Sequence, residues 1–180
     1  MQYNLGNCYQ YGLGVEKDEA KAFEWYKKSA KQEHSDAQYT LGLFYENGIG
    51  IEKDLKKGFY WYQKSAENGN NISQYNLGKC YQYGLGIEKN NVKAFEWYEK
   101  SSKQNYSNAQ NSLGFYFENG LGIDKDLKQA FYWYQKAAEN GNKIAQFNLG
   151  VCYQYEKGVK KNNIKALESQ LKNMMMHNLC

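Results

Sequence analysis

The dipeptide Leu-Gly recurs at a constant spacing of 36 residues, beginning at Leu5, Leu41, Leu77, Leu113 and Leu149. A fixed period of about 20 to 50 residues is typical of chains that stack one short unit end to end. The sequence therefore predicts a row of nearest-neighbour interfaces in place of one central core. We number the repeats 1 to 5, at residues 1–36, 37–72, 73–108, 109–144 and 145–180, and give each site the repeat position that it has in residues 1–36.

Each repeat is predicted to form two helices. In repeat 1 the first helix, helix A, covers residues 2–11, and the second, helix B, covers residues 19–31, because apolar residues follow a helical spacing in both. Gly12 and Gly14 end helix A, and Asp18 is suited to cap helix B. The fold class is therefore all-α, an α/α solenoid of 36-residue helix-turn-helix repeats, which we expect to be right-handed.

The residue types at two further repeat positions predict how the helices pack. Gly6 and its copies lie inside helix A, where glycine costs about 1 kcal/mol relative to alanine, so a close helix crossing is expected there. Tryptophan at repeat position 25 lies on the apolar stripe of helix B in repeats 1 to 4, which favours a place in the core over a role in binding a ligand. These tryptophans are Trp25, Trp61, Trp97 and Trp133.

Composition excludes several classes of function. Hydrophobic residues make up 42% of the chain and aromatic residues 17%, so extensive disorder is not expected. The net charge is +4, but all 23 basic residues are lysine, and without arginine nucleic-acid binding is disfavoured. The sequence shows no membrane-spanning run and no export signal.

Cys8, Cys80 and Cys152 recur in alternate repeats, too far apart for disulfides. We expect reduced cysteines and a cytoplasmic protein.

Catalysis is disfavoured because no reactive groups converge. His34 falls in a short connection between repeats and His177 in the C-terminal tail, and neither has cysteine or carboxylate neighbours at zinc or nucleophile spacing. We therefore expect no enzyme activity, no metal site and no cofactor.

A binding surface is expected on helix A, away from its core stripe. Repeat positions 4, 7 and 11 cluster on one side of a helical wheel. Amide and tyrosine groups mixed with apolar side chains there suit an extended peptide, while packing against a neighbouring repeat is the alternative interpretation. The candidate protein-binding residues are Asn4, Asn7, Tyr11, Thr40, Leu43, Asn47, Asn76, Lys79, Tyr83, Ser112, Phe115 and Asn119.

The repeated pattern resembles the Sel-one-like repeat family, a relative of the tetratricopeptide repeats that includes the cysteine-rich-protein-like group. The pattern consists of Leu-Gly-x-x-Tyr, Gly-x-Gly-Val/Ile, a capping Asp, Lys-Ala-x-x-Trp-Tyr-x-Lys and Glu-Asn-Gly. Four copies each keep most of these elements, and a fifth copy matches more weakly. The resemblance implies an α/α superhelix that serves as an adaptor for other proteins. Some secreted relatives carry a disulfide within each repeat, but this chain lacks the second cysteine of such a pair.

The predicted function is a non-catalytic scaffold that binds proteins or extended peptides on the concave helix A face. One alternative is a structural spacer within a larger signalling protein, for example one linked to a kinase. A hydrolase acting on lactams or peptidoglycan is a weaker alternative.

Repeat 5 diverges after Tyr155, so residues 145–180 form either a degenerate repeat or a C-terminal cap or tail. We expect the array to be a fragment of a longer one.

Overall fold

A computed structural model describes the backbone of residues 1–175 and the side chains of residues 1–169. Within residues 1–175 the chain forms ten α-helices and no strand, which confirms the predicted all-α repeat fold. It divides into two compact units, Met1–Asn90 and Asn91–Cys180. His177, which the sequence analysis weighed as a reactive group, lies outside the described residues, as does Cys180.

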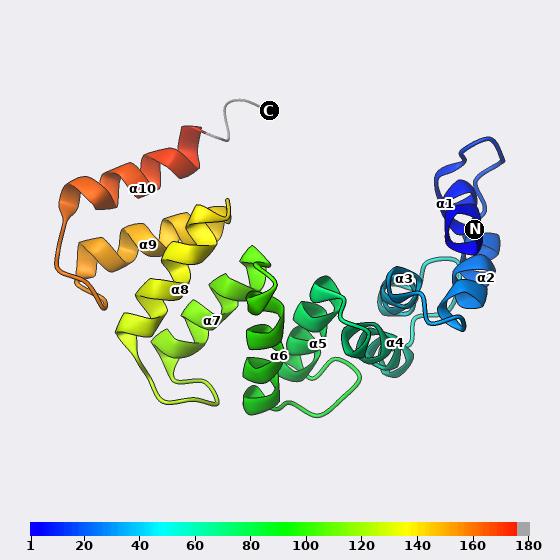
Figure 1. Ribbon diagram of the computed structural model, residues 1–180, viewed down its shortest axis with the longest axis horizontal. Helices are drawn as coiled ribbons and strands as arrows, with labels where there is room; N and C mark the ends of the chain where they lie inside the picture. The colour runs from blue at the N-terminus through cyan, green and yellow to red at the C-terminus, as the bar shows by residue number, and fades with distance from the viewer. Residues whose placement is uncertain (176–180) are drawn as a thin grey trace. The chain divides into compact units, whose positions relative to one another are not determined.

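The first unit contains five helices, in which A and B helices alternate (Figure 1). They are α1 (Gln2–Tyr11), α2 (Glu19–Ala30), α3 (Ser35–Asn47), α4 (Leu55–Glu67) and α5 (Asn71–Tyr83). Helix α1 has the predicted bounds, and α2 ends one residue before the predicted end. Each helix packs against the next along the chain, as expected for nearest-neighbour interfaces.

The second unit continues the alternation, beginning with a B helix. Its helices are α6 (Asn91–Lys103), α7 (Ser107–Asn119), α8 (Leu127–Glu139), α9 (Lys143–Tyr155) and α10 (Asn163–Met175). Again each helix packs against the next. Among the described residues of both units, no helix is long and apolar enough to cross a membrane, and no acidic, histidine or cysteine side chains group as metal ligands would.

The helix ends follow the predicted capping residues. Asp18 accepts a hydrogen bond from the Lys21 backbone N–H at 2.9 Å, and Asp54 accepts one from Lys57 at 3.0 Å. Gly48 ends α3 in the left-handed conformation, with φ of 72°. This conformation lets its N–H reach back to the Phe44 carbonyl oxygen. The turn chemistry read from the sequence therefore sets where the helices begin and end.

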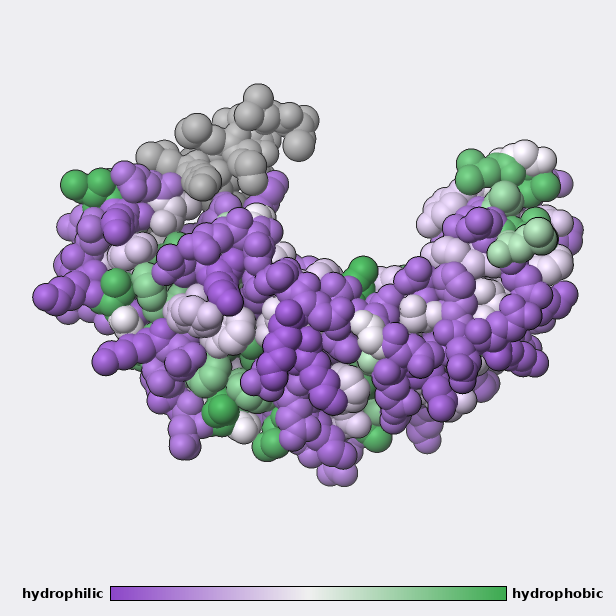
Figure 2. Space-filling model, viewed as in Figure 1, coloured by the Kyte–Doolittle hydropathy of each residue, from purple (hydrophilic) through white to green (hydrophobic). Residues whose placement is uncertain are grey.

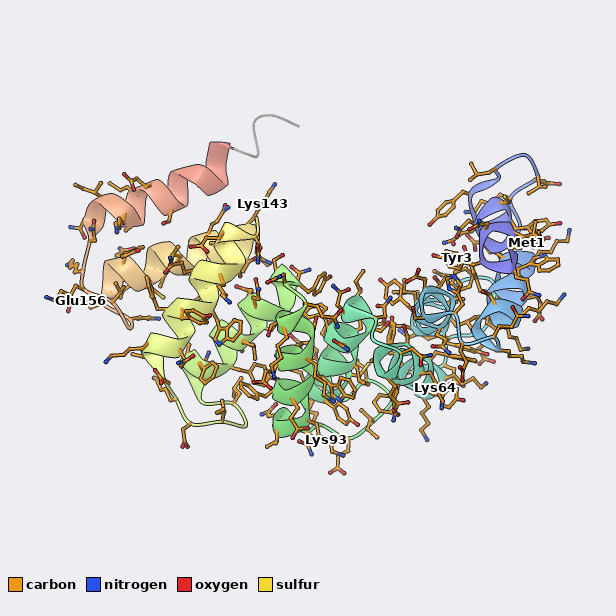
Figure 3. The ribbon with its side chains drawn as sticks, viewed as in Figure 1. Met1, Tyr3, Lys64, Lys93, Lys143 and Glu156 are labelled. Atoms are coloured by element: carbon orange, nitrogen blue, oxygen red, sulfur yellow. The ribbon has the colours of Figure 1, made fainter. Side chains whose placement is uncertain are left out.

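Glu156 takes the left-handed capping position after α9 (Figure 3), with φ of 57°, where earlier repeats have glycine. For a residue with a Cβ, this conformation costs about 1–2 kcal/mol relative to the right-handed one. We expect Glu156→Gly to raise the free energy of unfolding of the second unit by about 1 kcal/mol. Gly120→Ala, which places a Cβ at the φ of 66° that ends α7, is the matched control and should lower it. Urea unfolding followed by circular dichroism measures both, and no gain from Glu156→Gly would contradict the capping argument.

The core forms where an A helix crosses its B helix at a glycine, as α1 crosses α2 at Gly6 and α7 crosses α8 at Gly114. A Cβ on Gly6 would lie 2.6 Å from the Tyr26 ring, and one on Gly114 would lie 2.5 Å from the Tyr134 ring. No side chain larger than hydrogen fits this space without displacement of the ring. The close helix crossing predicted from the repeated glycine is therefore confirmed at these positions.

The tryptophan prediction needs correction. Trp25 and Trp97 are half-buried at the edge of the core, with the Lys28 ammonium 4.2 Å and the Lys100 ammonium 3.9 Å from the centres of their rings. The tyrosine at the next position, repeat position 26, is the fully buried aromatic residue instead. Successive helical residues point about 100° apart, so only one of the pair faces the glycine of helix A. The fully buried tyrosines at repeat position 26 are Tyr26, Tyr62, Tyr98 and Tyr134.

Glutamine at repeat position 2 ties each repeat to the one before it. Gln38 is buried and donates through Nε2 to the Ala30 carbonyl oxygen at 3.2 Å, while its Oε1 accepts from the Asn68 amide at 3.0 Å. In the second unit, Gln110 Oε1 accepts from the Asn140 amide at 2.9 Å. Both ends of these buried amides are satisfied, as buried polar groups generally are.

The cysteines Cys8, Cys80 and Cys152 are free thiols. Burial raises the pKa of the Cys80 thiol to about 12 and that of the Cys152 thiol to about 11. Because the reactive species is the thiolate, these two buried thiols are inert packing groups at neutral pH.

Candidate protein-binding surface

The first unit contains nine of the twelve candidate residues, on α1, α3 and α5. Four of the nine are exposed, and four others are half-buried. The exposed residues are Asn4, Tyr11, Asn47 and Tyr83, and the half-buried ones are Asn7, Leu43, Asn76 and Lys79. Tyr11 and Tyr83 end their helices and are 64% and 55% exposed. Two large aromatic side chains therefore stand out from the odd-numbered helices of this unit.

Thr40 departs from the expected exposed surface. It is 9% exposed, and its hydroxyl donates to the Asp36 carbonyl oxygen one turn earlier at 2.8 Å. Asn7 is also engaged, because its Oδ1 accepts from the buried Tyr26 hydroxyl at 2.7 Å. Asn7 therefore bonds to helix B of its own repeat, not to the neighbouring repeat that the alternative interpretation names, and Thr40 bonds to its own helix. Thr40 is therefore no longer counted in the surface, and Asn7 is at most a partial member.

The second unit holds the other three candidates, all on α7. Phe115 and Asn119 are exposed, and Ser112 is half-buried. The Asn119 amide donates to the Phe115 carbonyl oxygen at 2.8 Å, and Asn47 of α3 donates to the Leu43 carbonyl oxygen at 2.9 Å in the same way. These amide groups satisfy the last turn of their own helices, which leaves the aromatic and aliphatic side chains as the more available contacts.

Sequence reasoning missed residues of repeat 5 that extend the surface onto α9. Phe147 is exposed, and Tyr155 is exposed at the last position of the helix. The Asn148 amide donates to the Asn111 side-chain oxygen at 3.1 Å and so links α9 to α7. Asn148 and Tyr155 occupy the repeat positions 4 and 11 already singled out in the other copies. The repeat period indicates Asn148 and Tyr155, whereas Phe147, at repeat position 3, lies outside the three positions that the helical wheel selects.

Exposed hydrophobic side chains also gather at the turn after α1. Figure 2 shows hydrophobic spheres over this end of the first unit, on a face that is otherwise largely hydrophilic. Leu13 and Val15 are the exposed apolar residues of the turn, and Tyr11 directly precedes it. This turn therefore places apolar side chains next to the candidate residue Tyr11.

A buried tyrosine and a carboxylate fix the helix crossing behind the surface in each unit. In the first unit the Tyr62 hydroxyl donates to Glu46. In the second, Glu118 accepts from the Tyr134 hydroxyl at 2.7 Å and from the Lys157 ammonium at 2.6 Å. Burial alone would raise the pKa of Glu118, but the hydrogen bonds and the charge of Lys157 outweigh it and lower that pKa. The carboxylate is therefore held ionised as a structural group.

The lowered pKa makes a prediction about pH. The Glu118 carboxyl group binds a proton less readily in the folded state than in the unfolded state. The ionised carboxylate therefore contributes its full stabilisation at pH values above the pKa that Glu118 has in the unfolded chain. This stabilisation is lost as the pH falls through the lower pKa that Glu118 has in the folded protein. We expect Glu118→Gln to cost about 1 kcal/mol at pH 7, with the difference from the parent shrinking below about pH 4. Urea unfolding at pH 7 to 3 measures this.

The matched background for this experiment is Lys157→Met, which removes the cationic partner of Glu118. In that background the pH dependence of the Glu118→Gln effect should become smaller, because the ion pair that lowers the pKa is gone. A cost of Glu118→Gln that stays constant down to pH 3 would contradict the assignment.

The stacked helix pairs, the glycine crossings and the exposed side chains of the A helices together define an α/α repeat protein with a recurring surface. The chain belongs to the Sel1 repeat family. The family model, described as Sel1 repeat, matches residues 1–34, 35–70, 71–106, 107–142 and 143–168. The resemblance seen in the sequence is therefore confirmed, and it extends into repeat 5. Proteins of this family generally serve as scaffolds for protein interactions.

Solved structures give the same result. A Sel1 repeat protein from Oxalobacter formigenes has a TM-score of 0.94 and 33% identity, over 98% of this chain and 70% of that one. The protein c5321, a protective antigen of uropathogenic Escherichia coli with an SLR fold, has a TM-score of 0.91 and 32% identity. That match covers 95% of this chain and 37% of c5321.

A cysteine-rich relative is more distant. Helicobacter pylori cysteine-rich protein B has a TM-score of 0.57 and 28% identity, over 72% of this chain and 92% of that one. No curated protein sequence matches the chain. These comparisons show the family and the fold.

Proposed function

We propose that the chain is a non-catalytic scaffold that binds partner proteins or extended peptides through the exposed side chains of its A helices. The observation that carries the proposal is that exposed aromatic residues recur on the A helices of both units. Tyr11 and Tyr83 belong to the first unit, and Phe115, Phe147 and Tyr155 to the second. Each unit thus carries its own set of exposed aromatic residues, and we use the name helix A surface for these residues in either unit.

The chemistry of the helix A surface favours a peptide ligand. Tyrosine and phenylalanine are enriched in protein interfaces, since they offer a large contact area at a low entropic cost. Half-buried Asn76 on α5 and exposed Asn4 on α1 add amide groups, which both donate and accept hydrogen bonds and so match a peptide backbone. Lys79 is the one charged residue among the twelve candidates. The expected ligand is therefore an extended segment with apolar side chains.

A cross-linked pull-down from native cell extract tests the proposal. The parent chain is compared with Tyr11→Ala/Tyr83→Ala in the first unit and with Phe115→Ala/Phe147→Ala in the second. We expect a partner that the parent captures to be lost, by about tenfold or more, from at least one of the two double variants. Circular dichroism shows whether each variant remains folded, which is expected because all four side chains are exposed.

The control is Tyr60→Ala/Tyr132→Ala, which removes exposed tyrosines from the B helices α4 and α8. This double variant loses as much exposed aromatic surface but leaves the A helices unchanged. It should capture the same partners as the parent. Equal capture by all three double variants would place binding elsewhere, and no specific capture by the parent would favour a spacer.

A further inference from the structure

Helices α1 and α5 have nearly the same sequence. Residues 2–11 and 74–83 carry the same residue at every position except one, where α1 has Asn7 and α5 has Lys79. Identical side chains at identical helical positions make the same surface, so the two helices present nearly the same face to a neighbour. The contacts of α5 therefore indicate what α1 can bind.

In α5 this face is covered by the preceding helix, α4. The Phe59 ring meets the Tyr81 ring edge to face, with the ring centres 5.5 Å apart and an angle of 89° between the ring planes. The Gln74 side-chain amide donates to the Ala66 carbonyl oxygen at 3.2 Å. Residues seven apart lie on one side of a helix, so α4 docks through a ring near its start and a small residue near its end.

The same interface forms at the other places where a B helix precedes an A helix within one unit. The residue pairs that stack edge to face are Phe23 with Tyr45, Phe95 with Phe117, and Phe131 with Tyr153. The small residues at repeat position 30 are Ala30, Ala66, Ser102 and Ala138, and each accepts a hydrogen bond from the glutamine of the next A helix. Four copies of one contact define how a B helix docks on an A helix in this chain.

The corresponding face of α1 is open. Among the described residues, no helix lies against α1 as α4 lies against α5. Leu5 and Cys8 of α1 are half-buried, whereas Leu77 and Cys80, the same residues in α5, are buried. This difference in burial at identical residues marks the area that a docked helix would cover.

The turn after α1 leaves a second contact of this interface unfilled. A Cβ on Gly50 in repeat 2 would lie 2.7 Å from the Glu19 carbonyl carbon, and one on Gly86 in repeat 3 would overlap the Leu55 carbonyl group. In both repeats the turn glycine therefore lies directly against the start of the preceding B helix. A Cβ on the equivalent Gly14 would meet nothing within 4 Å.

We propose that the outer face of α1, formed by Leu5, Cys8, Tyr9 and Gly14, docks an amphipathic α-helix of a partner protein. The partner helix carries an aromatic ring and, seven residues later, a small residue, as α4 does. Its ring would meet the Tyr9 ring edge to face, and its first turn would lie against Gly14. The argument for this occupant is continuity with the interface that the chain already forms four times. The face is separate from the helix A surface and does not depend on the proposed scaffold function.

A second copy of this chain is a poorer source of the helix. Its helices α2, α4, α6 and α8 already use the ring at repeat position 23 against the A helix that follows them. Helix α10 has Leu167 in place of that ring. The occupant is therefore a helix of another protein.

A peptide with the sequence of residues 54–67, blocked at both ends, is the probe that tests the proposal. It contains all of α4 and the capping Asp54, and it is titrated into the ¹⁵N-labelled full chain observed by NMR. We expect amide shifts in α1 and in residues 12–17, with a Kd of about 0.1–1 mM, because a short peptide must first be ordered as a helix. Phe59→Ala in the peptide should weaken binding at least about tenfold.

A variant and its matched control locate the docked ring. Tyr9→Ala in the chain should weaken peptide binding at least about fivefold, because it removes the ring that Phe59 would meet. Tyr11→Ala makes the same change two residues further along α1, on the helix A surface, and should bind the peptide like the parent. Tyr9→Ala and the Phe59→Ala peptide together should lose less than the product of the separate losses, by about twofold to tenfold.

Two glycine variants keep the test decisive if Tyr9→Ala does not fold. Gly14 and Gly69 have φ of 73° and 85°, and a Cβ on either would meet nothing within 4 Å, so alanine strains both turns in the same way. Only Gly14 lies where the docked helix would begin. Gly14→Ala should therefore weaken peptide binding about tenfold, whereas Gly69→Ala should bind like the parent.

The proposal would be overturned if the peptide caused no shifts in α1 or in residues 12–17 up to about 2 mM, a concentration above the expected Kd. Undiminished binding by folded Tyr9→Ala and by Gly14→Ala would also overturn it. Shifts in α1 that depend on the concentration of the chain alone would assign the face to a second copy and so overturn the assignment to a partner helix. None of these outcomes affects the pull-down with the helix A double variants, so failure of one proposal is distinguishable from failure of the other.

Discussion

Replacing Tyr134 by alanine is expected to lower the free energy of unfolding of the second unit by about 3–5 kcal/mol. The ring is 1% exposed and lies against Gly114, and its hydroxyl donates to Glu118 at 2.7 Å. Truncation would leave a cavity at the helix crossing and would remove one of the two donors to the partly buried Glu118 carboxylate. Urea unfolding followed by circular dichroism measures the loss.

Tyr132→Ala is the matched control for this experiment. It removes the same type of side chain from the same helix, two residues away, but Tyr132 is 45% exposed. Its ring contacts Trp133 and the Lys136 ammonium at the surface, so a cost of about 1 kcal/mol or less is expected. If the two variants lost similar amounts of stability, repeat position 26 would not be the centre of the core.

Gly114→Ala is expected to lower the free energy of unfolding by about 1–2 kcal/mol, despite the higher helix propensity of alanine. The new Cβ would lie 2.5 Å from Tyr134 Cδ1, and overpacking of this kind costs about 1–3 kcal/mol. The gain in propensity, about 1 kcal/mol, offsets only part of a larger steric cost. The Tyr134 ring has little freedom to move away, because its hydroxyl is held by Glu118.

The double variant Gly114→Ala/Tyr134→Ala separates the steric explanation from a general effect on helix α7. Once the ring is removed, the added methyl group meets no obstacle and fills part of the cavity. The double variant should therefore be more stable than the sum of the single effects predicts, by about 1–3 kcal/mol. Strict additivity would contradict the direct contact between these positions.

Several features of the fold follow from local sequence and were predicted correctly for that reason. The 36-residue recurrence of Leu-Gly defined the helix pairs, and glycine after helix A and aspartate before helix B defined their ends. Capping depends on a few neighbouring residues, so Asp18 and Gly48 act as the sequence indicates. The glycine inside helix A also indicated a close crossing, because its cost in a helix needs a reason in packing.

The choice between adjacent aromatic residues depended on the tertiary structure. Trp133 and Tyr134 both lie within the apolar stripe of helix B, and periodicity alone does not say which faces the partner helix. The crossing at Gly114 decides it in favour of Tyr134, which leaves Trp133 half-buried.

The candidate surface was determined only in part by the sequence, since a helical wheel identifies a face but not what covers it. Tyr11 and Tyr83 are exposed as that face predicts, whereas Thr40 is buried and Asn7 is bonded to a tyrosine of the next helix. The sequence by itself determined the repeat, the helices and the residue types at each position. Only the packing of one helix pair on the next decided which side chains reach solvent, because burial depends on neighbours that are distant in sequence.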